Sequence, residues 1–122
     1  MGLDFSHGGA HWAYSGFMRF RKRLAAVYGV ELSKMEGFQM DWEPKISNPI
    51  PWTKTTCGEL TALINHSDCD GYLRDYQCKK MAPALRKAVE SWPNGDYDKE
   101  QALLLADGME RAAKEKKRLR FF

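Results

Sequence analysis

The sequence predicts a mainly helical α+β domain, with about four helices around one core. Apolar residues recur at steps of three and four in several segments, which is typical of helices that bury one face. Short alternating segments stand near both ends of the chain. The 122 residues, of which 43% are hydrophobic, suffice for one modest core. We therefore expect a single globular domain over residues 1–122.

The two ends of the chain have the pattern of short strands. Leu3 and Phe5 alternate with small or polar neighbours, and Leu119 and Phe121 alternate with arginines. A period of two places alternate side chains on opposite faces of a strand. We expect the two ends to pair as a short antiparallel ribbon with helices packed on one face, because a lone ribbon is only marginally stable.

The first helix is expected over about residues 10 to 28. Its apolar stripe contains Tyr14, Phe17, Phe20, Leu24 and Tyr28. Gly29 follows at a position where helices commonly end. A long irregular connection at about 30–55 comes next, because its prolines break regular elements. We expect its tryptophans, Trp42 and Trp52, to fold back onto the core.

Two further helices are expected at about 57–65 and about 75–92. The first of these begins with a capping box, in which Thr56 accepts a backbone amide and Glu59 returns to the cap. Pro83 is expected to kink the second, because proline removes a backbone donor and crowds the preceding turn.

The last helix follows a turn at residues 92–95, and Asp98 is expected to cap it. Its inward face would carry Leu105, Met109 and Ala112. Lysines near its end suit the negative end of the helix dipole.

Positive charge gathers in two clusters, although the net charge is only +3. Solvated helix faces are the favoured interpretation of both. The alternative is a nucleic-acid-binding protein, which requires the two clusters to share one face. The clusters are Arg19, Arg21, Lys22 and Arg23, and then Arg111, Lys114, Lys116, Lys117, Arg118 and Arg120.

The segment 66–77 resembles a degenerate EF-hand loop. Asp68 and Asp70 occupy its third and fifth positions, and Gly71 occupies the sixth, where the backbone needs positive φ. His66 and Gln77 replace the acidic ligands of the first and last positions. Tight calcium binding is therefore not expected. The favoured interpretation is a turn that needs no metal. If the loop binds an ion, a transition metal such as zinc, held by His66 with Asp68 or Asp70, is favoured over calcium.

Catalytic signatures are missing from the chain, so no catalytic residue is assigned. The phosphate-binding, dinucleotide-binding and nucleophile-elbow motifs do not occur. His7 and His11 are four residues apart, and two histidines at that spacing on one face of a helix can hold zinc. A polar helix start, with His7 bonded to the backbone, is the favoured interpretation of this pair. A metal-dependent hydrolase that uses these histidines and the 66–71 loop is therefore an alternative, provided that the two segments converge.

The leading hypothesis is a non-catalytic binding domain that captures a small ligand or blocks a host protein. His7, His11, Tyr14, Arg19 and Arg21 are the candidate ligand-binding residues. An arginine offers a forked set of donors to phosphate or carboxylate.

The cysteines and hydropathy indicate a cytoplasmic setting. The three cysteines form no CxxC pair and their number is odd, so a disulfide framework is not indicated. No apolar stretch is long enough for a membrane span, and the chain opens without the pattern of a signal peptide. We expect a cytoplasmic protein without a membrane partner.

Several motifs together resemble a family of small uncharacterised proteins from bacteria and their phages. These motifs are the Gly2-Leu3-Asp4-Phe5-Ser6-His7 start, Ala13-Tyr14-Ser15-Gly16-Phe17 with Arg19 and Arg21, and His66-Ser67-Asp68-Cys69-Asp70-Gly71. The resemblance spans nearly the whole chain and implies a prokaryotic or phage origin. It implies no activity.

Overall fold

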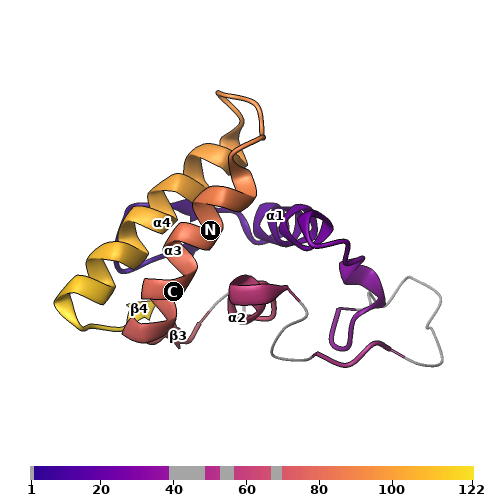
Figure 1. The fold of residues 1–122 in the computed structure, drawn as a ribbon, viewed down its shortest axis with the longest axis horizontal. Coiled ribbons are helices and arrows are strands. Elements are labelled where there is room, and N and C mark those ends of the chain that lie inside the picture. Colours follow the sequence, from indigo (N-terminus) through magenta and orange to yellow (C-terminus); the bar gives the residue numbers. More distant parts are fainter. Residues whose placement is uncertain (1, 39–48, 53–56, 67–69) are drawn as a thin grey trace.

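The computed structural model describes residues 2–38, 49–52, 57–66 and 70–122 and is a mainly helical α+β fold, as predicted (Figure 1). The helices are α1 (Tyr14–Val27), α2 (Thr61–Ile64), α3 (Asp75–Val89) and α4 (Tyr97–Glu115), with 3-10 turns at Leu32–Lys34 and Gly58–Leu60. The strands are β1 (Leu3–Asp4), β2 (His11–Trp12), β3 (Tyr72–Leu73) and β4 (Leu119–Arg120).

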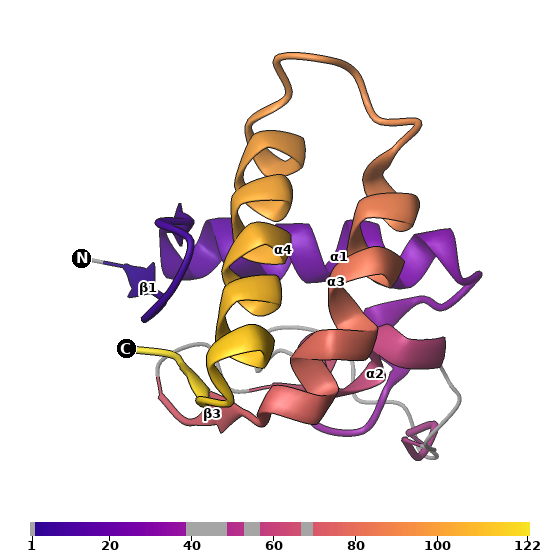
Figure 2. The same cartoon turned by 60° about the vertical axis from the view of Figure 1, so that its left-hand side comes forward.

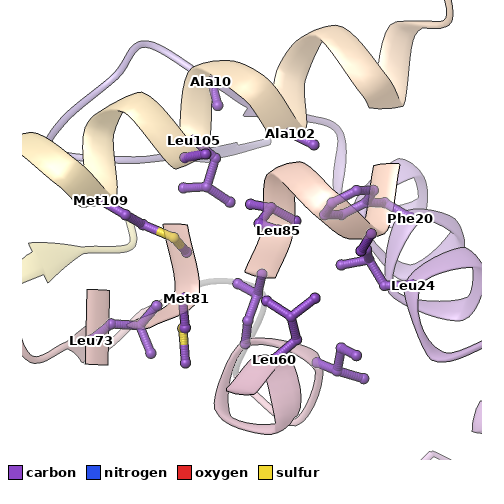
Figure 3. Packing of buried hydrophobic residues seen from close by; sticks show 14 of the residues in the cluster. Ala10, Phe20, Leu24, Leu60, Leu73, Met81, Leu85, Ala102, Leu105 and Met109 are labelled. Carbon is purple, nitrogen blue, oxygen red and sulfur yellow. The ribbon is translucent and has the colours of Figure 1, made fainter. Parts of the chain in front are cut away.

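Helices α3 and α4 lie side by side, and α1 crosses this pair (Figure 2). The short α2 and the 3-10 turn before it pack against α1 and α3. Figure 3 shows Phe20 of α1, Leu60, Leu85 of α3 and Leu105 of α4 meeting in the centre, where each is fully buried. The apolar stripes of the three long helices thus form one core.

The two ends of the chain pair in antiparallel fashion, as predicted. Each end also pairs with another strand of the fold. Strand β1 pairs with β2, and β3 pairs with β4. An isolated bridge between Phe5 and Phe121 joins these two pairs. Asp4 and Phe122 exchange backbone hydrogen bonds of 2.8 and 3.0 Å.

An aromatic cluster on α1 lies beneath this junction. Trp12 stacks on Phe20 with ring centroids 4.4 Å apart, and Phe5 meets Phe121 edge to face at 4.8 Å. Phe17 of α1 touches Phe5, Trp12 and Phe121. The five rings therefore attach both ends of the chain to one helix.

Two predicted helix starts are corrected by the structure. The first helix begins at Tyr14 rather than near residue 10, because His11 and Trp12 form a strand that pairs with β1. The last helix is capped by Asp96 rather than Asp98: its carboxylate accepts a 3.0 Å hydrogen bond from the Lys99 amide.

The irregular connection is confirmed where it is described. It contains one 3-10 turn and a bridge between Met35 and Ile50. Trp52 packs against the core and donates to the carbonyl of Glu36 at 2.9 Å, whereas Trp42 and the cap residue Thr56 lie outside the described residues. The second helix is short, as predicted.

Gly71 has φ of +98°, which confirms the predicted turn before β3. A different constraint applies to Gly108 in the middle of α4. A Cβ there would lie 2.4 Å from the carbonyl oxygen of His7. The backbone of the N-terminal loop at His7 therefore packs directly against the backbone of α4 at Gly108.

Gly108→Ala should destabilise the fold by about 1–3 kcal/mol, because the methyl group must push the loop off α4. The control is Gly16→Ala in α1, where a Cβ would meet its nearest neighbours at 3.7 and 3.9 Å. That change should be neutral or stabilising by up to about 1 kcal/mol, because alanine favours helix. Urea unfolding measures both. Equal effects of the two substitutions would contradict the close approach at Gly108.

Candidate functional site

A hollow of about 440 Å³ lies between β2, the first half of α1 and the start of α4. We call it the α1–α4 hollow. Its walls include His11, Gly16, Arg19, Arg23, Tyr97 and Asp98. All of these segments belong to the described residues, and the volume is in the range of small-molecule sites.

An ion cluster closes one side of the hollow. Arg23 donates to Asp96 and to Asp98, each at 2.9 Å. Its guanidinium also lies over the ring of Trp92, with 3.8 Å between the guanidinium carbon and the ring centroid. Two carboxylates thus pair with this one arginine and join α1 to the start of α4, and the three groups together carry one net negative charge.

Strand β2 is held from the α4 side by three hydrogen bonds. Gln101 accepts from the His11 amide at 2.9 Å, and the Tyr97 hydroxyl donates to the His11 carbonyl at 2.6 Å. The Trp12 indole donates to Asp98 at 3.0 Å. These bonds give the floor of the hollow a fixed geometry, which a binding site requires.

Arg19 differs from Arg23 because it is exposed and makes no ion pair within the described part of the chain. The Gly16 position, three residues earlier, leaves its guanidinium uncovered: a Cβ at residue 16 would lie 3.9 Å from an Arg19 terminal nitrogen. His11 lies on the same wall, and its Nδ1 donates to Asp4 at 2.8 Å. The hollow therefore presents one arginine that makes no ion pair with the residues that the structure describes.

Of the other predicted ligand-binding residues, His7 and Arg21 do not line this hollow. Arg21 is only 3% exposed. Its guanidinium donates to the carbonyls of Ile64 and His66 at the end of α2, where a cation suits the helix dipole. His7 lies beside Glu115 at the other end of α4, at 3.5 Å. Tyr14 is 38% exposed at the start of α1 and is not part of the hollow's wall.

This placement also corrects the interpretation of the first basic cluster. Arg21 is buried and Arg23 is paired, so only Arg19 and Lys22 remain exposed basic groups there. The two clusters thus do not combine into one face of solvated cations.

The predicted metal ligands have separate surroundings. His66 stacks on Phe121 with centroids 3.9 Å apart, and its Nε2 donates to the carbonyl of Tyr72 at 3.1 Å. Asp70 is exposed, and Asp68 lies outside the described residues. The helical spacing expected for His7 and His11 is not formed, because no helix covers residues 7–11. Within the ranges that the structure describes, no group of three or more His, Cys, Asp or Glu could hold a metal ion.

Two cysteines are buried free thiols, Cys57 and Cys78. Burial raises the pKa of both thiols, that of Cys78 to about 11. A thiol with a raised pKa is a poor nucleophile near neutral pH. Neither group therefore favours covalent catalysis.

A second hollow, of about 380 Å³, lies between α2 and α3 and includes Thr61, Asn65, Tyr76 and Lys80. Residues 53–56 and 67–69, which adjoin α2 on both sides in the sequence, lie outside the described residues. The α1–α4 hollow is the better-defined candidate.

Sequence patterns identified Arg19 and His11 but not the opposite wall of the hollow. Tyr97 and Asp96 lie more than seventy residues from Arg23 in the sequence, and only the folded structure brings them together. The sequence predicts Asp98 as a helix cap. In the structure its carboxylate instead accepts hydrogen bonds from Trp12 and Arg23.

The chain matches no protein-family model, no curated protein and no solved structure. The resemblance to small bacterial and phage proteins therefore stays a hypothesis. Among the helices of the described residues, none has the length and apolar character to cross a membrane.

Asp96→Asn should lower stability near neutral pH, and this loss should shrink in acid. Hydrogen bonds from Arg23 and from the Lys99 amide hold the pKa of the Asp96 carboxyl below its ordinary value. The ionised Asp96 carboxylate therefore adds fully to the free energy of unfolding above about pH 4, which is the pKa of an aspartate in the unfolded chain. This stabilisation is lost as the pH falls through the lower pKa that Asp96 has in the folded protein. Asparagine keeps the helix cap while removing the charge.

Urea unfolding of both proteins between about pH 7 and pH 2 measures this difference. A difference in stability that stays constant over the whole range would contradict a role for the Arg23–Asp96 ion pair.

Proposed function

We propose that this chain is a non-catalytic binding domain, and that the α1–α4 hollow holds the phosphate or carboxylate group of a small ligand. The observation that carries the proposal is the contrast between two arginines one turn apart. Arg23 is paired with Asp96 and Asp98, whereas Arg19 is exposed on the wall of the same hollow without an ion pair among the described residues.

The chemistry of the wall supports an anionic group with a polar body. A guanidinium binds phosphate or carboxylate through two parallel hydrogen bonds. The Tyr97 ring, which is 53% exposed, and the His11 imidazole offer a surface for the rest of the ligand. A concave site of about 440 Å³ favours a small ligand over the broad contact that a blocked host protein would need.

Gly16 adds support, because glycine is a poor residue for a helix interior. Alanine would fit here without a clash and would favour the helix, but its methyl group would project towards Trp12 and Arg19. A glycine at this position therefore leaves slightly more room beside Trp12 and Arg19, at a cost in helix stability.

The two other hypotheses from the sequence have less support. A metal-dependent hydrolase would need His7, His11 and the 66–71 loop to act together. However, His7 lies beside Glu115, His11 bonds to Asp4, and His66 of the loop bonds to the Tyr72 carbonyl. A nucleic-acid site built from both basic clusters would need Arg21 and Arg23, which are engaged within the protein. The cytoplasm of a bacterium stays the proposed setting, and the buried free thiols of Cys57 and Cys78 are compatible with it.

Arg19→Gln should weaken anion binding by about tenfold or more, because it removes a charge-assisted pair of hydrogen bonds. Inorganic phosphate and citrate serve as probes, titrated into the isotope-labelled protein while NMR follows its amide and arginine side-chain signals. The wild-type protein should show saturable shifts at Arg19, His11 and Tyr97. Gly16→Ala should also weaken binding while keeping or raising the melting temperature.

The matched control is Arg111→Gln, which removes an exposed arginine from α4 outside the hollow. It should leave the titration unchanged. An equal loss of binding in Arg111→Gln, or shifts without saturation at millimolar probe, would rule out the hollow as an anion site.

A further inference from the structure

The β3–β4 pair has one buried face and one exposed face. Leu73 lies opposite Leu119, and both are buried. Tyr72 lies opposite Arg120, and both are exposed. Because alternate residues of a strand share a face, Arg118 extends the exposed side beyond Arg120. We call Tyr72, Arg74, Arg118 and Arg120 the β3–β4 face.

An exposed aromatic ring lies among the guanidinium groups of this face. Tyr72 is 39% exposed. The guanidinium carbon of Arg118 lies 4.3 Å from the centroid of its ring, and that of Arg74 lies 5.7 Å away. These cation–π contacts hold flat groups in place at the surface. Planar ligands such as nucleobases stack on aromatic rings and on guanidinium planes.

Among the described residues, cations outnumber carboxylates on and beside this face. Arg74, Arg118 and Arg120 form no ion pair among the described residues. The end of α4 adds three exposed lysines close by in the sequence, Lys114, Lys116 and Lys117. One carboxylate of that region, Glu115, contacts His7 and Lys117. Asp70 is an exposed carboxylate at the start of the turn before β3. Cations therefore predominate.

A second exposed ring continues the same edge. Phe122 is 60% exposed, and its main chain is held by the two hydrogen bonds with Asp4. Residues 118, 120 and 122 are exposed, whereas residues 119 and 121 are buried. The exposed side of this segment thus carries two arginines followed by an aromatic ring.

We propose that the β3–β4 face binds single-stranded nucleic acid, with bases stacked on Tyr72 and phosphates held by Arg74, Arg118 and Arg120. Positive charge along the backbone of the strand, combined with aromatic rings that stack on its bases, is how proteins bind single strands without reading sequence. A duplex keeps its bases inside the stack, so it could use the arginines but not Tyr72. The site uses only the second basic cluster and is independent of the α1–α4 hollow.

Fluorescence anisotropy with a labelled oligothymidylate of about 12 nucleotides tests the proposal on the full chain. Tyr72→Ala should weaken binding by about fivefold or more, while Tyr72→Phe, which keeps the ring, should bind like the wild type. Arg118→Gln combined with Arg120→Gln should lower both the affinity and its dependence on salt. The logarithm of the wild-type affinity should fall against the logarithm of salt concentration with a slope of about −2, as expected for three phosphate contacts.

Lys22→Gln is the control, because it removes an exposed cation from α1. It should change the affinity little. Circular dichroism confirms that each variant is folded, and Tyr72→Phe separates loss of the ring from loss of structure.

Heparin, a polyanion without bases, distinguishes stacking from charge alone. Equal competition by heparin together with full binding by Tyr72→Ala would overturn the nucleic-acid proposal in favour of a general acidic partner. The absence of oligothymidylate binding at about 50 mM salt, where phosphate contacts are strong, would also overturn it.

Discussion

Phe121 packs edge to face against Phe5, and both rings contact Phe17 of α1. Strands of two residues have little stability of their own, so these aromatic contacts have to hold the ends of the chain. Each such ring pair adds to the free energy gained by burying apolar surface. Trp12, stacked on Phe20, extends the cluster along α1. Segments from both termini thus become part of one core with the helices.

Both proposed binding surfaces depend on this cluster. The Trp12 ring is buried in the aromatic cluster, and its indole N–H donates to Asp98. Asp98 in turn binds Arg23 at the edge of the α1–α4 hollow. Phe121 follows Arg120 directly, and its amide donates to the Gly71 carbonyl at 2.9 Å. Burial of Phe121 therefore keeps Arg120 on the opposite, exposed side of its strand. Trp12 thus fixes the first surface through its hydrogen bond to Asp98, and Phe121 fixes the second through the alternation of side chains along its strand.

Local patterns predicted the parts of the fold that depend on local physics. The spacing of Phe17, Phe20 and Leu24 identified the buried side of α1, and alternation identified both terminal strands. Patterns could not show that residues 11–12 form a strand, because that strand exists only through β1 and through Gln101 and Tyr97 of α4.

The candidate site was predictable only in part, for the same reason. Arg19, Arg21 and Arg23 look alike in the sequence, yet one is exposed, one is buried at the end of α2 and one is paired with two aspartates. The partners that separate them lie more than forty residues away. Long-range packing, rather than residue type, decides which arginine remains available.

The most direct test of the role of the aromatic cluster is urea unfolding of Phe121→Ala beside Phe122→Ala. The two residues are adjacent and identical in type, but Phe121 is 3% exposed and Phe122 is 60% exposed. Phe121→Ala should lower the free energy of unfolding by about 3–5 kcal/mol, whereas Phe122→Ala should change it by no more than about 0.5 kcal/mol. Similar small effects of both substitutions would contradict the view that the cluster holds the chain ends in the fold.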